Sequence, residues 1–255
     1  MKKRLYYLAF GLVAIAASSC SKIDNYPAPS NTLRGSVTDA GTGTTVQTEI
    51  GGRGTRIKLL ETSYSSNPTP YYLESMQDGT YNNTKIFAAT YNISPEGAFV
   101  PLVVTDSVGK VVSDKSQNVT ITGTNTVTTV NFKVEPFLRV DWVGQPKFNA
   151  DSTVTVQIKI SRGTTNAAYQ LPITDVNLYV SNTQYDGDNN YDPVHSPLAT
   201  FSTTVQTDSL LSNTLTITTK GGALPQQDVY FRVGARINAG LDYYNYSTPV
   251  SIKYP

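Results

Sequence analysis

The chain has 255 residues, of which 39% are hydrophobic and 15% are charged, and its formal net charge is +1. A charge this close to zero provides no basic surface for nucleic acid, so nucleic acid is excluded as a partner. The single cysteine, Cys20, cannot form a disulfide within one chain. A composition rich in Thr, Val and Tyr and divided by Gly, Pro and Asn predicts an all-β protein of short strands.

The first twenty residues have the organisation of a secretory signal. A basic start at residues 2–4 precedes an apolar run at residues 5–17, and Ser18-Ser19-Cys20 follows. The run is shorter than the roughly 20 apolar residues of a membrane-spanning helix. The sequence around Cys20 resembles the lipobox of bacterial lipoproteins. This resemblance implies cleavage before Cys20 and acylation of its thiol, so that several acyl chains anchor the protein in a membrane.

The residues after Cys20 indicate where the anchored protein is delivered. Ser21 stands where lipoproteins of the inner membrane commonly have Asp, which favours the outer membrane. Lys22 and Asp24 faintly resemble the surface-export signals of Bacteroidetes lipoproteins, so we expect the cell surface. Cleavage also removes the three basic residues of the signal, and the formal charge then falls from +1 to −2.

The expected organisation is two tandem β-sandwich domains after a signal peptide and a Pro-containing tether. Alternating apolar and polar segments with turn signals at short intervals have the spacing of sandwich strands. Asp78-Gly79 is the strongest short hairpin signal. The predicted boundaries are 1–19 for the signal peptide, 20–30 for the lipidated tether, 31–134 for the first domain and 135–255 for the second.

The first domain has eight expected strands. They lie at residues 33–39, 56–61, 71–77, from Thr80-Tyr81, and at 89–93, 100–105, 117–122 and 126–134. The domain resembles the carboxypeptidase-regulatory-like, or transthyretin-like, β-sandwich, a module that implies no catalytic residues. The resemblance rests on Gly35-Ser36-Val37-Thr38-Asp39, Thr42-Gly43, Ile57-Lys58-Leu59, Asp78-Gly79-Thr80-Tyr81 and Thr90-Tyr91-Asn92-Ile93.

The second domain also alternates apolar and polar residues. Its expected strands lie at residues 137–142, 153–160, 176–181, 199–204, 215–219, 229–237 and 246–252. The segment 229–252 resembles the last two strands of a fibronectin type III or immunoglobulin-like domain. It has the pattern Tyr230-x-x-Val233-x-Ala235, then Asn238-x-Gly240, then Ser247-x-Pro249-Val250.

Five segments carry a resemblance of the whole chain to a known group: the lipobox, the Tyr26-Pro27-Ala28-Pro29 linker, and residues 56–61, 78–81 and 230–235. The chain resembles a group of two-domain Bacteroidetes lipoproteins of unknown function. Members are associated with outer-membrane glycan uptake systems of the starch-utilisation type. The resemblance implies a role in polysaccharide capture, with a polysaccharide or oligosaccharide and an outer-membrane transporter complex as partners. It implies no cofactor and no catalytic residue, so the protein is expected not to be an enzyme.

The residues themselves give little support to catalysis. Cys20 is used as the anchor, and the only histidine, His195, lies in a Pro-flanked segment that predicts a solvated loop. No Gly-x-Ser-x-Gly elbow accompanies this histidine, and a His-based zinc site lacks a second ligand. A glycosidase pair of carboxylates has no marking motif and stays open as an alternative.

One acidic segment is a weak candidate for calcium. Asp186, Asp188, Asn190 and Asp192 place oxygen ligands at alternate positions, as Ca²⁺ prefers. The EF-hand pattern is broken, since Tyr191 stands where the pattern needs Gly. The other interpretation is an acidic, Asn-rich turn whose side chains bond to their own backbone.

Aromatic side chains in loops are the candidates for glycan binding, because flat rings stack on the apolar faces of sugars. Tyr185 with Tyr191, and Tyr243 with Tyr244, are predicted to share one end of the second sandwich. The leading hypothesis is a non-catalytic, glycan-binding accessory of an uptake system. The alternative is a structural or docking subunit of a TonB-dependent transporter complex that does not bind glycan itself.

Overall fold

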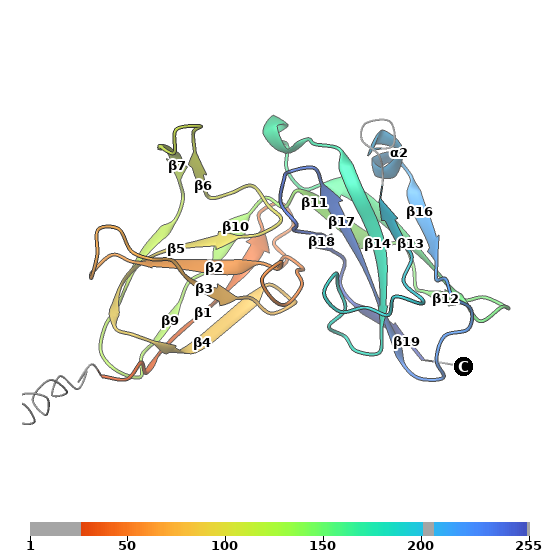
Figure 1. The fold of residues 1–255 in the computed structure, drawn as a ribbon, viewed down its shortest axis with the longest axis horizontal. Coiled ribbons are helices and arrows are strands. Elements are labelled where there is room, and N and C mark those ends of the chain that lie inside the picture. The colour runs from red at the N-terminus through yellow and green to blue at the C-terminus, as the bar shows by residue number, and fades with distance from the viewer. Residues whose placement is uncertain (1–26, 201–206, 254–255) are drawn as a thin grey trace, which may run out of the picture.

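The computed structural model describes residues 27–200 and 207–253, which form two β-domains lying side by side (Figure 1). Cys20 and the signal peptide lie outside the described residues. Within the described ranges the helical elements are short: η1 (Ala167–Tyr169) and α2 (Thr207–Ser212). No helix in these ranges is long and apolar enough to span a bilayer. The expected all-β architecture of two tandem domains is confirmed.

The first domain packs two four-stranded sheets face to face. One sheet has the order β10-β1-β4 with β9 also beside β1, and the other has the order β3-β2-β5-β8. The strands are β1 (Asn31–Asp39), β2 (Arg56–Glu61), β3 (Tyr71–Glu74), β4 (Thr80–Ile86), β5 (Ala89–Glu96), β8 (Gln117–Ile121), β9 (Val127–Thr129) and β10 (Phe132–Val134).

The core of this domain follows from the alternation of its strands. Leu33 and Val37 of β1 face Ile57 of β2, and all three side chains are fully buried. Gly35 lies between the two β1 residues, where an added Cβ would come within 1.7 Å of the Val130 carbonyl oxygen. The Tyr81 hydroxyl donates to that same oxygen at 2.6 Å. The segment expected as one strand at 126–134 is therefore divided into β9 and β10 at the point where it crosses Gly35.

The Asp78-Gly79 signal forms a turn but not a hairpin. Gly79 has φ of +76°, the left-handed conformation that glycine adopts readily. The flanking strands, however, belong to different sheets, since β3 pairs with β2 and β4 pairs with β1. The expected hairpin is thus wrong, because the turn carries the chain from one sheet to the other.

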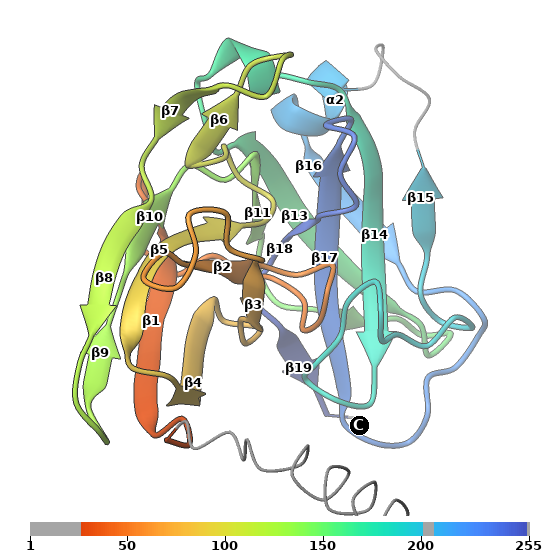
Figure 2. The ribbon, with the colours of Figure 1, turned by 60° about the vertical axis from the view of Figure 1, so that its left-hand side comes forward.

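A two-stranded hairpin projects from the first domain. It consists of β6 (Val103–Thr105) and β7 (Val111–Asp114), which pair only with each other among the described strands. Figures 1 and 2 show it beyond the edge of the two sheets. Its apolar side chains lie largely in solvent, and Val108 at the tip is 85% exposed.

The second domain is also a pair of packed sheets. One contains β11, β13, β12 and β16, and the other has the order β15-β14-β17-β18 with β19 also beside β17. The strands are β11 (Leu138–Trp142), β12 (Lys147–Phe148), β13 (Val154–Arg162), β14 (Ile173–Ser181), β15 (Leu198–Thr200), β16 (Thr214–Thr218), β17 (Val229–Ile237), β18 (Asn245–Tyr246) and β19 (Val250–Ile252). The rest of the strand expected at 199–204 lies outside the described residues.

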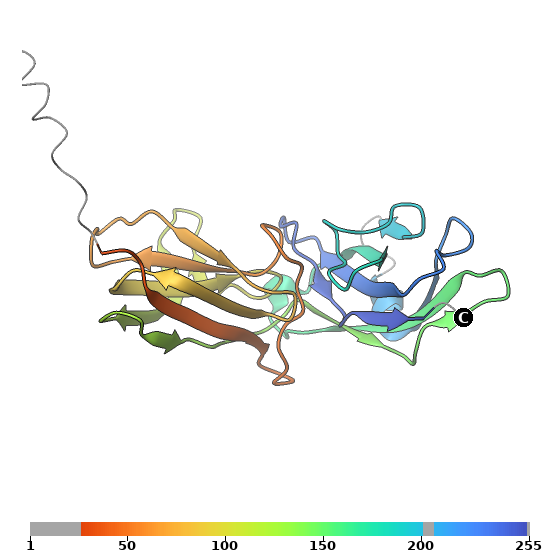
Figure 3. The ribbon, with the colours of Figure 1, turned by 90° about the horizontal axis from the view of Figure 1, so that it is seen from below.

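Polar contacts hold the two domains together at several places, three of which involve residues at the centre of the interface. Arg139 and Asp39 form an ion pair, with Nε 2.5 Å and Nη2 2.9 Å from the two carboxylate oxygens. The Asn245 amide donates to the Ala98 carbonyl oxygen at 2.8 Å. In the third contact the Tyr246 hydroxyl donates to Glu49 Oε2 at 2.7 Å, and both residues are buried. Figure 3 shows the domains meeting end to end in an elongated molecule.

A fully buried arginine supports the third contact. The Arg232 guanidinium donates to the carbonyl oxygens of Ser247 and Asp186, at 3.0 and 3.1 Å, and lies 4.3 Å from the centre of the Tyr246 ring. Burial lowers the pKa of Arg232 to about 10. The Tyr246 ring and the nearby carboxyl groups of Asp186 and Glu49 compensate the charge of Arg232, which packs directly against that ring.

We expect Tyr246→Phe to destabilise the protein, because the substitution leaves the buried Glu49 carboxylate without the hydroxyl donor. The expected loss in free energy of unfolding is about 1–3 kcal/mol, measured by urea unfolding. Tyr72→Phe is the matched control: the Tyr72 hydroxyl has no hydrogen bond within the described residues, and the ring keeps its contact with Arg56 at 4.0 Å. The control should change stability by less than about 0.5 kcal/mol, and an equal loss in both variants would contradict the prediction.

The same interface predicts a pH dependence of stability. Burial raises the pKa of Asp186 to about 7 and also raises the pKa of Glu49. Between pH about 4, where a free Asp titrates, and pH about 7, the folded chain holds a proton that the unfolded chain has released. The contribution of Asp186 to the free energy of unfolding should therefore be fully present below pH about 4, fall as the pH rises through this window and be lost above pH about 7.

Asp186→Asn tests this assignment, because it removes the titrating group. The variant should flatten the fall in unfolding free energy by up to about 1.4 kcal/mol per pH unit, measured by urea unfolding between pH 4 and pH 8. Asp228→Asn, at an exposed position, should leave the slope unchanged. A slope that persists in Asp186→Asn would show that another group is responsible.

Candidate functional site between the domains

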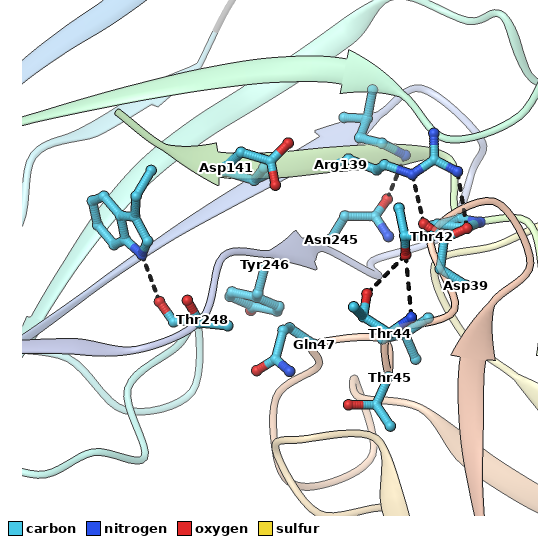
Figure 4. A pocket seen from close by; sticks show the side chains of 15 residues that line it. Asp39, Thr42, Thr44, Thr45, Gln47, Arg139, Asp141, Asn245, Tyr246 and Thr248 are labelled. Carbon is cyan, nitrogen blue, oxygen red and sulfur yellow. Dashed lines mark hydrogen bonds and ion pairs between the residues drawn. The ribbon is translucent and has the colours of Figure 1, made fainter. Parts of the chain in front are cut away.

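A groove lies where the two domains meet. It has a volume of about 420 Å³ and is open to solvent. Figure 4 shows side chains from both domains around it. The first domain contributes Asp39, Thr42, Thr44, Thr45, Val46 and Gln47, and the second contributes Pro136, Leu138, Arg139, Val140, Asp141, Trp142, Asn245, Tyr246 and Thr248.

The first wall is the turn that follows β1. The Asp39 carboxylate accepts the Gly41 backbone N–H at 2.8 Å, which closes the turn as a local Asx-type hydrogen bond. Gly43, with φ of +76°, completes the reversal. The hydroxyls of Thr42 and Thr44 lie 2.8 Å apart on the groove side. Hydroxyl groups, which both donate and accept, therefore line this wall.

The second wall is β11, whose alternation separates core from groove. Leu138 and Val140 are buried, while Arg139 is half-buried and Asp141 is exposed. Trp142 ends the strand, half-buried, and its indole N–H donates to the Thr248 carbonyl oxygen at 2.8 Å. The indole ring is therefore held in one orientation at the edge of the groove.

Some of the charged and polar side chains at the groove already have partners within the protein, and others do not. Asp39 is neutralised by Arg139, and although burial opposes the shift, the Arg139 hydrogen bonds and charge lower the pKa of Asp39. Within the described part of the chain, no hydrogen bond is made to the side chains of Asp141 and Gln47. A carboxylate and an amide thus remain free to bond to a ligand in the groove.

The four predicted tyrosines do not form one exposed surface. Tyr185 is 45% exposed, whereas Tyr244 is only 7% exposed. Tyr191 and Tyr244 are brought together through Tyr179, whose ring centre lies 5.5 Å from that of Tyr191 and 6.3 Å from that of Tyr244. This cluster is part of the packing of the second domain. The loops that carry Tyr191 and Tyr244 do lie close together, but the two rings meet in a packed cluster and do not form an exposed surface for sugar.

Tyr243 and Tyr244 have structural neighbours that explain their burial. The Asn177 amide donates to the Tyr244 hydroxyl at 3.3 Å, and the Arg236 guanidinium lies 4.9 Å from the ring centre. Burial raises the pKa of Tyr244 to about 12. Tyr243 is half-buried and packs against the core of the second domain. The prediction of Tyr244 as an exposed glycan-stacking residue is therefore wrong.

The acidic segment is committed to protein contacts. The Asp186 carboxylate accepts from the Gln77 amide at 3.4 Å, Asp188 pairs with Arg53 at 2.6 Å, and Asp192 pairs with His195 at 2.5 Å. Because each carboxylate has a different partner, the three do not converge on one point. Asn190 instead donates to the Tyr185 carbonyl oxygen at 2.7 Å. These contacts favour the interpretation of an acidic turn over that of a calcium loop.

His195 is not the solvated loop side chain that its Pro-flanked position predicts. It is only 9% exposed, because Asp192 holds its ring from within the same turn. The neighbouring Ser196 is fully buried, and its hydroxyl accepts the Val180 backbone N–H at 2.9 Å. The three residues thus stabilise the loop that follows β14.

The groove was not predicted as a site from the sequence. Trp142, Gln47, Arg139 and Asp141 belong to no motif in the sequence. The alternation of residues 137–142 does indicate that Arg139 and Asp141 face away from the core. What it does not indicate is that the turn at residues 40–47 faces them. No cluster of three or more His, Cys, Asp or Glu side chains suited to a metal occurs in the described ranges.

Comparison with known proteins covers both domains. Residues 31–135 match the family model described as the N-terminal domain of a protein of unknown function, DUF3823. Residues 143–251 match the model described as the domain of unknown function DUF3823_C. No curated protein matches the chain.

Three solved structures extend the comparison. A DUF3823 family protein from Bacteroides uniformis is 31% identical, covers 89% of this chain and 100% of its own, and has a TM-score of 0.81. A second B. uniformis protein, provisionally assigned as carbohydrate binding, is 23% identical over 88% of this chain and 99% of its own, with a TM-score of 0.67. A DUF3823 family protein from Parabacteroides merdae is 20% identical over 89% and 100%, with a TM-score of 0.63. Because both of its domains match the family models and it is 31% identical to a solved member, the chain belongs to the DUF3823 family.

Proposed function

We propose that this protein is a non-catalytic outer-membrane lipoprotein that binds glycan in the groove between its domains, as an accessory of a polysaccharide uptake system. The observation that carries the proposal is the composition of the groove. Its lining combines the half-buried indole of Trp142 with threonine hydroxyls, the Gln47 amide and the Asp141 carboxylate. A few polar groups around an aromatic surface are enough for a ligand site, because they give both affinity and orientation.

The chemistry of these groups matches that of a sugar. A pyranose ring presents an apolar C–H face, which stacks on a flat aromatic ring, and a rim of hydroxyls that both donate and accept hydrogen bonds. The Gln47 amide can do both, whereas Asp141 accepts only. Because the Asp39–Arg139 ion pair is satisfied internally, the groove has no strong net charge to select an anionic ligand. We infer a neutral glycan.

The membrane anchor is the second part of the proposal. It rests on the basic start, the apolar run and the lone Cys20 after small residues. Acylation at Cys20 would keep the groove near the surface at which an uptake system works. The relative assigned provisionally as carbohydrate binding supports the same function, although at 23% identity it shows a shared fold alone.

A docking role remains the second candidate, and one observation favours it. The hairpin β6–β7 exposes Val108, Val111 and Val112, with Val112 60% in solvent. A projecting apolar hairpin with unpaired edges is suited to contact with another protein. In this reading the protein is a subunit of a TonB-dependent transporter complex and the groove binds no sugar.

We expect Asp141→Ala to weaken glycan binding about tenfold, because a lost hydrogen bond to a charged group is worth about 1.4 kcal/mol or more. Trp142→Ala should weaken it further, since the stacking surface is lost. The measurement is retention of the protein on a panel of soluble and insoluble polysaccharides. Asp141 makes no side-chain hydrogen bond within the described residues, so its removal should leave the fold intact.

Tyr185→Ala is the matched control, because Tyr185 is exposed but lies outside the groove. It should bind glycan like the parent protein. Loss of binding in Tyr185→Ala with normal binding in Asp141→Ala would move the site to the acidic loop. Retention on no glycan, together with co-purification of a transporter from membranes, would support the docking role instead.

A further inference from the structure

The end of the first domain at which the chain emerges carries exposed apolar side chains. This surface, the tether end, consists of the loops 62–70, 87–88 and 122–126 around the start of β1, together with Tyr71 and Val127, which directly follow two of these loops. Figures 1 and 3 show the start of β1 at the end of the molecule farthest from the second domain. The exposed fractions are 90% for Tyr64, 52% for Tyr71, 40% for Phe87 and 57% for Val127.

The position of the emerging chain on this end is fixed by hydrogen bonds. The Asn31 carboxamide oxygen accepts from the Thr126 backbone N–H at 3.0 Å, and its amide donates to the Gly123 carbonyl oxygen at 3.2 Å. Asn31 also pairs with Ile86 across β1 and β4, directly before Phe87. The chain therefore leaves the domain in the middle of the exposed apolar residues.

The chemistry of the tether end is that of a membrane interface. None of the sixteen residues in the three loops is charged; they are Thr, Ser, Asn, Pro, Gly and Ala with Tyr64 and Phe87. Tyrosine places an apolar ring and a polar tip at the boundary between acyl chains and water, where it is enriched in membrane proteins. Beside these loops lies a pocket of about 300 Å³, and the oppositely charged Glu61 and Lys85 flank its apolar residues. The pocket is lined by Leu59, Glu61, Thr69, Tyr71, Lys85, Ile86, Phe87 and Tyr91.

The length of chain before β1 sets which part of the molecule is nearest to the anchor. Ten residues lie between Cys20 and Asn31, and even fully extended the eleven peptide units reach no more than about 40 Å. The second domain lies on the far side of the first, so the tether end is the closest folded surface to the bilayer. We propose that the tether end rests on the lipid surface, with Tyr64, Tyr71 and Phe87 inserted at the headgroup level.

The proposal rests on the lipid anchor at Cys20, which is part of the proposed function. It adds an orientation, since the groove and the second domain are then directed away from the membrane. Because the loops are uncharged, the contact depends on buried apolar area and not on anionic lipid. Contact of the tether end with the bilayer should therefore persist at high salt.

A fluorescent reporter on the full chain in vesicles of phosphatidylethanolamine and phosphatidylglycerol tests the orientation. Ser66→Cys places a thiol-reactive dye in an exposed position of the tether end, and Ala150→Cys places the same dye in the second domain. Lipids carrying a headgroup quencher should quench the dye at residue 66 severalfold more than the dye at residue 150. Equal quenching at both positions overturns the proposal.

Variants separate the surface from the anchor. Tyr64→Ser, at a side chain that lies almost wholly in solvent, should reduce quenching at residue 66 without affecting the fold. Adding Tyr71→Ser and Phe87→Ser should abolish the difference between the two reporters while the protein stays in the membrane pellet. Unchanged quenching in the triple variant overturns the proposed contact of the tether end with the bilayer, but it leaves the lipid anchor at Cys20 standing. If the parent protein is found outside the membrane pellet and its Cys20 thiol reacts with the dye, the lipid anchor is absent. That result overturns both the anchor and the proposed orientation.

Discussion

The position of the groove depends on a buried polar interface between the domains, in which the Tyr246 hydroxyl of the second domain donates to the Glu49 carboxylate of the first and the Gln77 amide of the first donates to Asp186 of the second. The Tyr246 ring packs against the buried Arg232. An isolated buried carboxylate is costly, so these hydrogen bonds favour one arrangement of the domains over others. The Asp39–Arg139 ion pair on the groove side acts in the same direction. The two walls of the groove therefore keep a fixed separation.

The proposed function uses three separate surfaces of an elongated molecule. The groove lies between the domains, the hairpin β6–β7 projects from the side of the first domain, and the tether end lies opposite the second domain. A molecule arranged in this way can be held at a membrane by one end while its groove stays accessible. The hairpin is then free to contact a neighbouring protein. Glycan binding and docking are thus compatible activities of different surfaces.

The sequence predicts the fold better than the site, for a physical reason. Strand alternation is local, so residues 153–160 predict β13 and its buried face directly. The groove instead joins the turn at 40–47 with β11 and β18, and only the packing of the domains brings these segments together. The acidic loop shows the same limit: Asp186 and Asp188 suit calcium as ligand types, but the neighbouring domain supplies Gln77 and Arg53 as partners. Tyr244 is a residue type that often binds sugars in exposed loops, but here it is buried against Tyr179, which lies 65 positions earlier.

Trp142 allows the most direct test of the central claim, because it is the only tryptophan in the chain and it lies at the groove. The measurement is a titration of its fluorescence with a soluble glycan that the protein retains. Binding in the groove predicts a saturable change in Trp142 emission whose midpoint equals the dissociation constant measured by calorimetry. Saturable binding in the calorimeter with no change in Trp142 emission would place the glycan elsewhere and contradict the account.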